Sequence, residues 1–292
     1  MYIVAAFYHF FDFADYEKRR AELLKLFSAH HIKGSLLIAP EGINGTISGT
    51  RENIDAVLRY LQTEIVRGEF EHKESFFDKQ PFGKAKERLK KETIGMGEHC
   101  PPDKRGEYIE PKDWNALIAD PDTIVLDARN SYETYLGSFE NALDPRTKNF
   151  RELPDFIRNN LGDMKKKKIA TYCTGGIRCE KLTAWMKDQG FEHVYHLKGG
   201  ILKYLEEIPQ EQSTWNGECY VFDRRMAVGH GLSTGKHAMC FSCGYALNEA
   251  DQTHALYEAG VSCHHCHATT SDADKARYRM RHMQMTAHKQ TS

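Results

Sequence analysis

One segment in the second half of the chain constrains the fold more than any other. Residues 168–172 (KIATY) form a mostly apolar run, typical of a strand buried on both faces of a sheet, and they lead directly to Cys173. Two glycines follow, and residues 178–189 have the spacing of a helix that ends at Gly190. A strand, a cysteine, a glycine-rich turn and a helix in this order indicate a doubly wound α/β domain with a parallel sheet.

The turn after this strand predicts a stabilised thiolate. Backbone N–H groups at a helix N-terminus point toward one spot and carry partial positive charge, which lowers the pKa of a nearby thiol. We therefore expect Cys173 to be the reactive residue, with Arg178 adding a fixed positive charge. A purely structural cysteine is the weaker interpretation, because it would not need this arrangement. The residues expected to form the cradle are Thr174, Gly175, Gly176 and Ile177.

Cys179 follows Arg178 directly and has two interpretations. It is either a resolving thiol that attacks an oxidised Cys173, or a small residue packed in the first turn of the helix. Packing is the favoured interpretation.

The rest of the chain divides by pattern into further units. Residues 1–79 alternate strand and helix patterns in the order β-α-β-β-α-β, which predicts a ferredoxin-like domain. Residues 80–112 are expected to be a basic linker, and residues 113–213 the α/β domain. Residues 214–292 are rich in Cys and His, and predict a small metal-dependent module that ends in a polar, frayed tail.

The linker carries a cluster of positive charges. A solvated charged segment is the favoured interpretation, and a strip that binds RNA phosphates is the functional alternative. The formal net charge of −1 gives no bulk attraction to nucleic acid, so any basic surface has to be local. The candidate RNA-binding residues are Lys84, Lys86, Arg88, Lys90 and Lys91.

Two Cys-x2-Cys pairs near the C-terminus predict a metal site. Their spacing, C-x2-C-x19-C-x2-C, lets four thiolates converge on one tetrahedral ion, and zinc is the expected metal. A closed site with four protein ligands is structural, so catalysis is not expected there. His264 and His265 lie inside the second pair and are substitute ligands; His237 and His267 are weaker candidates. The expected ligands are Cys240, Cys243, Cys263 and Cys266.

The N-terminus has no basic leader, and no apolar run approaches the roughly 18 residues of a membrane span. We therefore expect a cytoplasmic protein with no membrane partner. In that compartment, eight cysteines are better explained as metal ligands or reactive thiols than as disulfides.

The central region resembles the rhodanese family. The loop CTGGIR is similar to the rhodanese active-site loop, and VYHLKGGI is similar to the closing strand and turn. Ser138 departs from many single-domain rhodaneses, which have His there. Cys173 to Arg178 is C-x4-R, whereas phosphatases with a related loop use C-x5-R, so phosphatase activity is disfavoured. Further matching residues are Asp127, Arg129, Glu133, Gly137 and Ala142.

Most of the chain resembles a narrower family, the rhodanese-domain tRNA uridine(34) hydroxylases. The most specific motifs are APEGING near the N-terminus and CTGGIRCEK in the rhodanese region. The resemblance implies that the chain makes 5-hydroxyuridine at the wobble position of tRNA with molecular oxygen, that its partner is the tRNA anticodon loop, and that Cys173 is the functional cysteine. Glu41 and Asn44 in PEGING either face the active site or, as the favoured interpretation, shape the turn.

The sequence shows no flavin motif, haem signature or evident iron triad. One mechanism needs none of these: the Cys173 thiolate adds to carbon 6 of uracil, and carbon 5 then captures oxygen from dioxygen or peroxide. A second route passes through a persulfide or sulfenate on Cys173. The alternatives to a hydroxylase are a sulfurtransferase and, less favoured, an RNA-binding scaffold with an inactive rhodanese domain.

Overall fold

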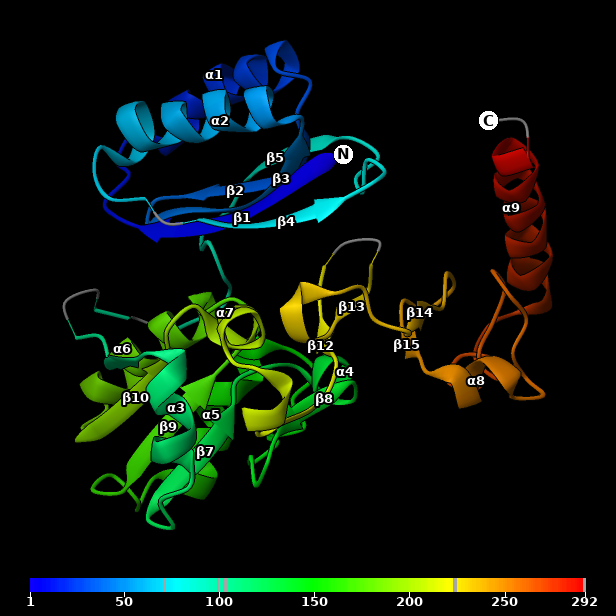
Figure 1. Ribbon diagram of the computed structural model, residues 1–292. Coiled ribbons are helices and arrows are strands. Elements are labelled where there is room, and N and C mark those ends of the chain that lie inside the picture. The colour runs from blue at the N-terminus through cyan, green and yellow to red at the C-terminus, as the bar shows by residue number, and fades with distance from the viewer. Residues whose placement is uncertain (71, 99, 102–103, 223–224, 291–292) are drawn as a thin grey trace.

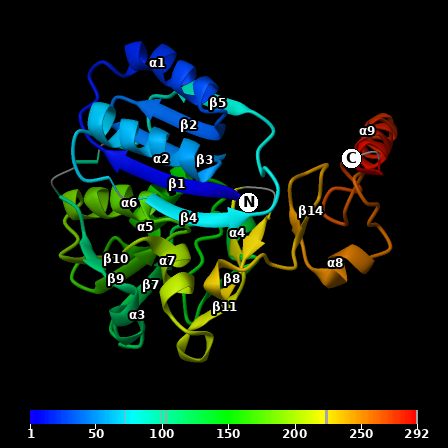
Figure 2. The same cartoon turned by 45° about the horizontal axis from the view of Figure 1, so that its top comes forward.

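The computed structural model describes residues 1–70, 72–98, 100–101, 104–222 and 225–290. Two units lie against each other, an N-terminal sheet with two helices and a central α/β domain, and a C-terminal module stands to one side of them (Figures 1 and 2). Residue 71 of the expected N-terminal domain, residues 99 and 102–103 of the expected linker, and residues 223–224 and 291–292 of the expected C-terminal module lie outside the described residues.

The N-terminal domain has the expected ferredoxin-like arrangement. Its antiparallel strands are ordered β4-β1-β3-β2, and α1 and α2 cover one face. Ile3, Ala5 and Phe7 of β1 alternate toward these helices and join the core, so the intervening residues point to the other side. The bounds are β1 Tyr2–Phe10, α1 Tyr16–Ala29, β2 Lys33–Ala39, β3 Gly42–Gly49, α2 Arg51–Tyr60 and β4 His72–Phe77.

The expectation of a linker from residue 80 to residue 112 is wrong at two places. Ala85–Leu89 form β5, which pairs in parallel with β2 and becomes the edge of the N-terminal sheet. Glu107–Ile109 form β6, which pairs in parallel with β10 of the central domain. The pattern hid β5 because its central residues Lys86, Glu87 and Arg88 are all charged; lysines are common on edge strands, where they prevent pairing with another chain.

The central domain is a parallel sheet ordered β6-β10-β9-β7 with helices on both faces, as expected for a doubly wound fold. Leu182 and Trp185 of α6 pack with Ile157 of α5 on one face. Trp114 of α3 and Tyr204 of α7 pack on the other. The bounds are α3 Pro111–Ile118, β7 Thr123–Asp127, α4 Ser131–Thr134, β8 Gly137–Phe139, α5 Leu153–Leu161, β9 Lys168–Tyr172, α6 Ile177–Asp188, β10 His193–Leu197 and α7 Gly200–Glu207.

The central domain also extends beyond the expected boundary at residue 213. Trp215–Gly217 form β11, which pairs with β8, and the Trp215 ring packs on Phe139 with centroids 5.0 Å apart. Cys219 and Val228 are buried in the same core. The strands β11, β12 (Cys219–Tyr220) and β13 (Ala227–Val228) therefore pack as part of the α/β domain, because their apolar side chains are buried in its core.

The C-terminal module contains the short hairpin of β14 and β15 and the helices α8 and α9. Their bounds are β14 Ala238–Met239, β15 Ala246–Leu247, α8 Glu249–Thr253 and α9 Asp272–Gln290. The expected frayed tail is instead the helix α9, which projects from the module (Figure 1). A bidentate ion pair between Arg279 and Glu258, at 2.5 and 2.6 Å, ties α9 to the loop before the second Cys pair. None of the helices in the described residues is both long and apolar enough to cross a membrane.

Candidate active site

Cys173 lies where the parallel sheet meets the N-terminus of α6. The strand β9 ends at Tyr172, and Gly176 caps α6 with a φ of 103°, a conformation that favours glycine. The Gly176 N–H donates a hydrogen bond to Cys173 Sγ at 3.1 Å. Cys173 has no exposed surface. The loop therefore holds a buried sulfur against a backbone donor, and of the four expected cradle residues it is Gly176 that supplies this N–H.

The surroundings of Cys173 favour its thiolate. Burial raises the pKa of the thiol, but a hydrogen bond with the Cys179 side chain, the positive charge of Arg178 and the N–H groups of Cys179 and Gly176 outweigh it. The pKa falls from 9.0 to about 5. At neutral pH the sulfur is therefore an anion, which is the nucleophilic form.

Arg178 acts less as an isolated charge than the sequence predicts. Its guanidinium makes a bidentate ion pair with Glu133, with Nη1–Oε2 at 2.6 Å and Nη2–Oε1 at 2.7 Å. Thr174 Oγ1 donates to Glu133 Oε1 at 3.1 Å, so the carboxylate also holds the cysteine loop. Both charged side chains are buried. Arg178 and Glu133 together fix the loop while nearly cancelling each other's charge.

Glu133 is a site residue whose role the sequence did not reveal, although its rhodanese-like position was evident. Its carboxylate accepts from the Asn130 N–H and completes the capping box of α4. In the same buried cluster, Arg129 Nη2 donates to Asp127 at 2.7 Å and to the Gly137 carbonyl at 2.6 Å. These rhodanese-like residues form a rigid buried support for the loop.

Cys179 is buried beside Cys173 in the first turn of α6. Its Sγ lies 3.6 Å from Thr171 Oγ1. Burial, and then the nearby Cys173 thiolate, raise the pKa of Cys179 well above its ordinary value. In this state Cys179 is a protonated donor to Cys173, and its role as a resolving thiol stays a prediction.

The N-terminal sheet covers the cysteine loop with residues that sequence reasoning missed. We call the side of this sheet opposite α1 and α2 the open face; it points toward the central domain (Figure 1). Tyr8 of β1 lies on this face, and a β-carbon added at Gly176 would lie 2.9 Å from its Oη. Lys73 of β4 is on the same face and donates to the Gly175 carbonyl at 3.1 Å and to the Gly199 carbonyl. No local pattern reports these contacts, because they depend on how two domains dock.

A second contact between the domains involves Lys181 of α6. Its Nζ lies 3.0 Å from both Glu41 carboxylate oxygens and 2.7 Å from Glu92 Oε1. Glu41 also accepts from the N–H and hydroxyl of Thr93, each at 2.8 Å, and Asn44 donates to the Thr93 carbonyl at 3.2 Å. Glu41 and Asn44 thus join the turn to the following segment and to α6, through hydrogen bonds that do not involve Cys173.

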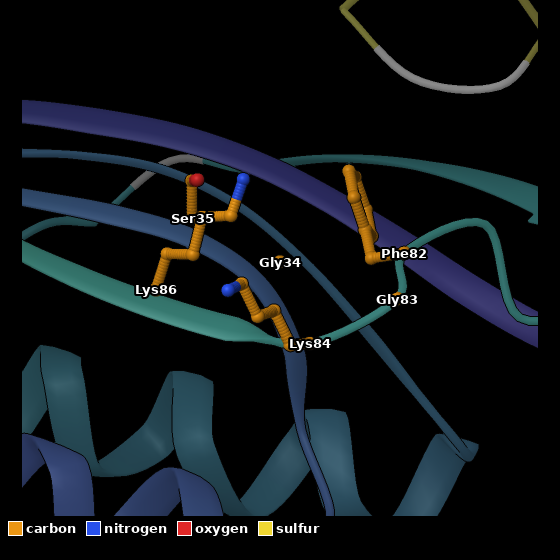
Figure 3. A pocket seen from close by; sticks show the side chains of 6 residues that line it. All are labelled: Gly34, Ser35, Phe82, Gly83, Lys84 and Lys86. Carbon is orange, nitrogen blue, oxygen red and sulfur yellow. The ribbon is translucent and has the colours of Figure 1, made fainter. Parts of the chain in front are cut away.

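The candidate RNA-binding lysines gather around β5. Lys86 pairs across the sheet with Ser35, which pairs with Thr46, so both side chains lie on the open face. A shallow hollow of about 430 Å³ lies there (Figure 3). Glycines at two positions leave it open, and Phe82 forms one wall. The lining residues are Gly34, Ser35, Phe82, Gly83, Lys84 and Lys86. Arg88 follows on the same face of β5, and Lys90 and Lys91 come just after the strand.

The four C-terminal cysteines meet at one point, as expected. One ligand atom from each, in Cys240, Cys243, Cys263 and Cys266, lies within 4.8 Å of the others, a grouping that is able to hold a metal ion. The turn between β14 and β15 carries the first pair, with the Cys240 N–H donating to the Tyr245 carbonyl at 2.8 Å.

The histidines proposed as substitute ligands have other partners. The His265 ring stacks on Tyr245, with centroids 3.8 Å apart, and His264 Nε2 lies 3.7 Å from Asp251. His237 Nδ1 lies 2.6 Å from Glu218 Oε2. His267 is likewise outside the grouping found among the described residues. Among the described residues, the group that is able to hold a metal ion therefore consists of four thiols.

Comparison with known proteins gives two family models that match successive parts of the chain. Residues 2–93 match the family model described as UPF0176 acylphosphatase like domain, and residues 110–207 match the Rhodanese-like domain. A rhodanese-related protein from Thermoplasma volcanium has 24% identity, covering 35% of this chain and 92% of its own, with a TM-score of 0.29.

Two relatives cover nearly the whole chain. A protein of Rhizobium etli named tRNA uridine(34) hydroxylase is 53% identical over 97% of this chain and 93% of its own length. A protein of Sinorhizobium fredii with the same name is 53% identical over 99% of this chain and 92% of its own. With this identity across all the units described above, the chain belongs to the tRNA uridine(34) hydroxylase family.

Proposed function

We propose that this chain is an enzyme that hydroxylates carbon 5 of the wobble uridine of tRNA, and that Cys173 is its reactive residue. Two findings together carry the proposal. The chain is similar over nearly its full length to proteins named for this reaction, and Cys173, at the expected position, is a buried thiol with a lowered pKa. The similarity includes the N-terminal domain and the cysteine-rich module, which a simple sulfurtransferase would not need.

The Cys173 thiolate supplies the nucleophile. It adds to carbon 6 of uracil, which makes carbon 5 electron-rich. With peroxide, carbon 5 attacks one oxygen, the O–O bond breaks and hydroxide leaves. With dioxygen, a hydroperoxide forms at carbon 5, and a two-electron donor such as a thiol reduces it to the hydroxyl group and water. Loss of the proton from carbon 5 and of the thiolate from carbon 6 restores the aromatic ring. The second route, through a persulfide or sulfenate on Cys173, uses the same cradle. Arg178 and the N–H groups of the loop stabilise the anion in either case.

The tRNA anticodon loop is the proposed partner. Its bases are single-stranded, so a wobble uridine enters a pocket without breaking a duplex. We assign phosphate binding to Lys84, Lys86, Arg88, Lys90 and Lys91. Phe82, beside two of these lysines, offers a ring on which a base stacks (Figure 3). The open face that carries them is the same face that covers Cys173.

Zinc is the proposed metal of the C-terminal module. Four thiols at mutual ligand spacing fit tetrahedral Zn²⁺, and no ligand position is left for water or substrate. The metal then holds together short hairpins that bury little apolar surface, and chemistry is left to Cys173.

The test is mass spectrometry of nucleosides from tRNA that lacks the modification, incubated with the purified protein in air and under nitrogen. A gain of one oxygen on uridine, seen in air and absent in Cys173→Ser, supports the hydroxylase. Full activity of Cys173→Ser would exclude both routes. Unchanged tRNA together with turnover of thiosulfate and cyanide would instead assign sulfur transfer, which the C-x4-R loop also suits.

A further inference from the structure

Lys73 brings the N-terminal sheet into direct contact with the reactive loop. It pairs across β4 and β1 with Ala6, which places it on the open face. Its ammonium donates to two carbonyls of the central domain, those of Gly175 in the cysteine loop and Gly199 before α7. A single side chain thus ties two loops of the central domain to the sheet above them.

The Gly175 carbonyl is connected to the Cys173 sulfur through a single peptide unit. This C=O and the Gly176 N–H belong to one planar peptide unit, so they point in opposite directions. The C=O accepts from Lys73 at 3.1 Å, and the N–H donates to Cys173 Sγ at 3.1 Å. Fixing the carbonyl therefore aims the N–H at the sulfur, and the positive charge on one side polarises the bond on the other.

The loop itself lacks side chains that hold this peptide in place. Both residues of the peptide are glycine, and at Gly176 the Tyr8 hydroxyl leaves no space for a β-carbon. Glycine peptides rotate more freely than others, so their orientation depends on outside contacts. Within the described residues, Lys73 is the side chain that donates to the Gly175 carbonyl.

Charged and titratable groups surround Lys73 from several elements. Cys173 and Cys219 favour its ammonium form, Glu206 of α7 does the same, and Lys203 of α7 opposes it. Burial has the largest influence and lowers the pKa of Lys73 to about 8. Because the thiolate of Cys173 stabilises the ammonium, the ammonium stabilises the thiolate to the same extent.

We propose that Lys73 is a positioning residue for the Cys173 thiolate, acting through the peptide that joins Gly175 and Gly176. The N-terminal domain then completes the reactive site in addition to contacting RNA. This deepens the proposed function, on which its meaning for catalysis rests, but the effect on the thiol is measurable without tRNA.

The test follows the thiolate absorbance of Cys173 in the ultraviolet against pH, as a difference between each full-length protein and its Cys173→Ser counterpart. Lys73→Met removes the charge and the donor while keeping the length of the side chain. We expect its titration midpoint to rise, so that near pH 6 the ratio of thiolate to thiol falls about tenfold. The matched control is Lys79→Met, since Lys79 is exposed just beyond the same strand; it should leave the ratio unchanged.

Lys73→Arg separates positioning from packing. Arginine keeps a positive donor, so we expect it to restore most of the thiolate ratio that Lys73→Met loses. Near-ultraviolet circular dichroism checks the fold of each variant. Should Lys73→Met unfold, Lys73→Leu, which also removes the charge and the donor, replaces it.

An unchanged thiolate ratio in the folded neutral variant would overturn the proposal, as would an equal loss in Lys73→Arg. The two proposals can also be told apart. If the Cys173 thiol of the wild type titrates at low pH and this low value depends on Lys73, but the protein leaves tRNA unmodified, the proposed function is refuted and this inference stands.

Discussion

Cys173 and the four C-terminal cysteines form two thiol sites in one chain, and their surroundings differ in kind. Cys173 is alone in a loop where a peptide N–H, the Cys179 thiol and Arg178 favour its anion. The other four thiols lie within 4.8 Å of one another. Burial raises the pKa of Cys243 and that of Cys263, the latter to about 11, whereas at Cys266 burial is outweighed by hydrogen bonds, which lower the pKa to about 7.

The difference shows what a protein provides for a thiolate in each case. One negative charge is stabilised by backbone dipoles and a fixed cation, so Cys173 is ionised without a metal. Four negative charges at this spacing repel one another, and a divalent cation has to compensate them. The first site is therefore suited to a free nucleophile, whereas the second is suited to hold a metal ion.

The largest expected effect is that of Cys173→Ser. Serine is not ionised in this cradle, so we expect the rate of 5-hydroxyuridine formation to fall at least about 10³-fold. The zinc content should remain that of the wild type. Cys100→Ser, which changes a partly exposed thiol outside both sites, is the matched control and should retain activity. A Cys173→Ser protein that loses zinc would show that the two sites are not independent.

Cys263→Ser tests the independence of the two thiol sites by changing the four-cysteine site instead of Cys173. Loss of one of four ligands should weaken zinc binding by more than about 100-fold. Most substitutions outside the four ligands reduce the affinity for zinc by less than this. Zinc content is measured after dialysis against a chelator, and the Cys173 titration is followed in parallel. If the midpoint of Cys173 moves together with zinc loss, the sites are coupled.

Glu133→Gln probes how the cysteine loop is supported. It leaves Arg178 buried without its partner, so we expect unfolding free energy to fall by about 3 kcal/mol. A double variant, Glu133→Gln with Arg178→Met, removes both charges and should be less destabilised than the sum of the single changes. Urea unfolding of the four proteins measures this coupling, and strict additivity would contradict the ion pair.

The pH dependence of stability gives the smallest effect. The pKa of Cys173 is about 5 in the folded chain and near 9.0 when unperturbed, so between these values the unfolded state binds more protons. The contribution of Cys173 to stability is therefore lost as pH falls through 5, grows as pH rises from 5 to 9, and is complete above pH 9. From pH 6 to pH 7.5 we expect the stability of the wild type relative to Cys173→Ser to rise by about 2 kcal/mol. A flat difference would mean that the thiol is not depressed.

Local patterns in the sequence predicted the parts of the molecule that local forces determine. The strand before Cys173, the glycine turn and the helix after it lie within one or two residues of their expected bounds. The spacing of the cysteine pairs likewise predicted their convergence. Both features depend on neighbours in the chain, so a single sequence contains enough information.

Features that depend on distant segments were not predictable in this way. In the sequence, Lys73 is one charged residue in a polar strand. Its contact with Gly175 forms because the two domains pack against each other. Arg178 and Glu133 were both visible, but their pairing depends on how α4 meets α6. The strand β5 was hidden by its own charges, which suit an edge strand as well as a solvated linker.

The complete burial of Cys173 has a consequence for the lifetime of the enzyme. An ionised thiol is the form that peroxide oxidises, and repeated oxidation to the sulfinic and sulfonic acids is irreversible or nearly so. With no surface of Cys173 exposed while the N-terminal sheet lies over it, solutes have no direct path to the sulfur. The complete burial of Cys173 therefore slows the irreversible loss of its thiolate to oxidation.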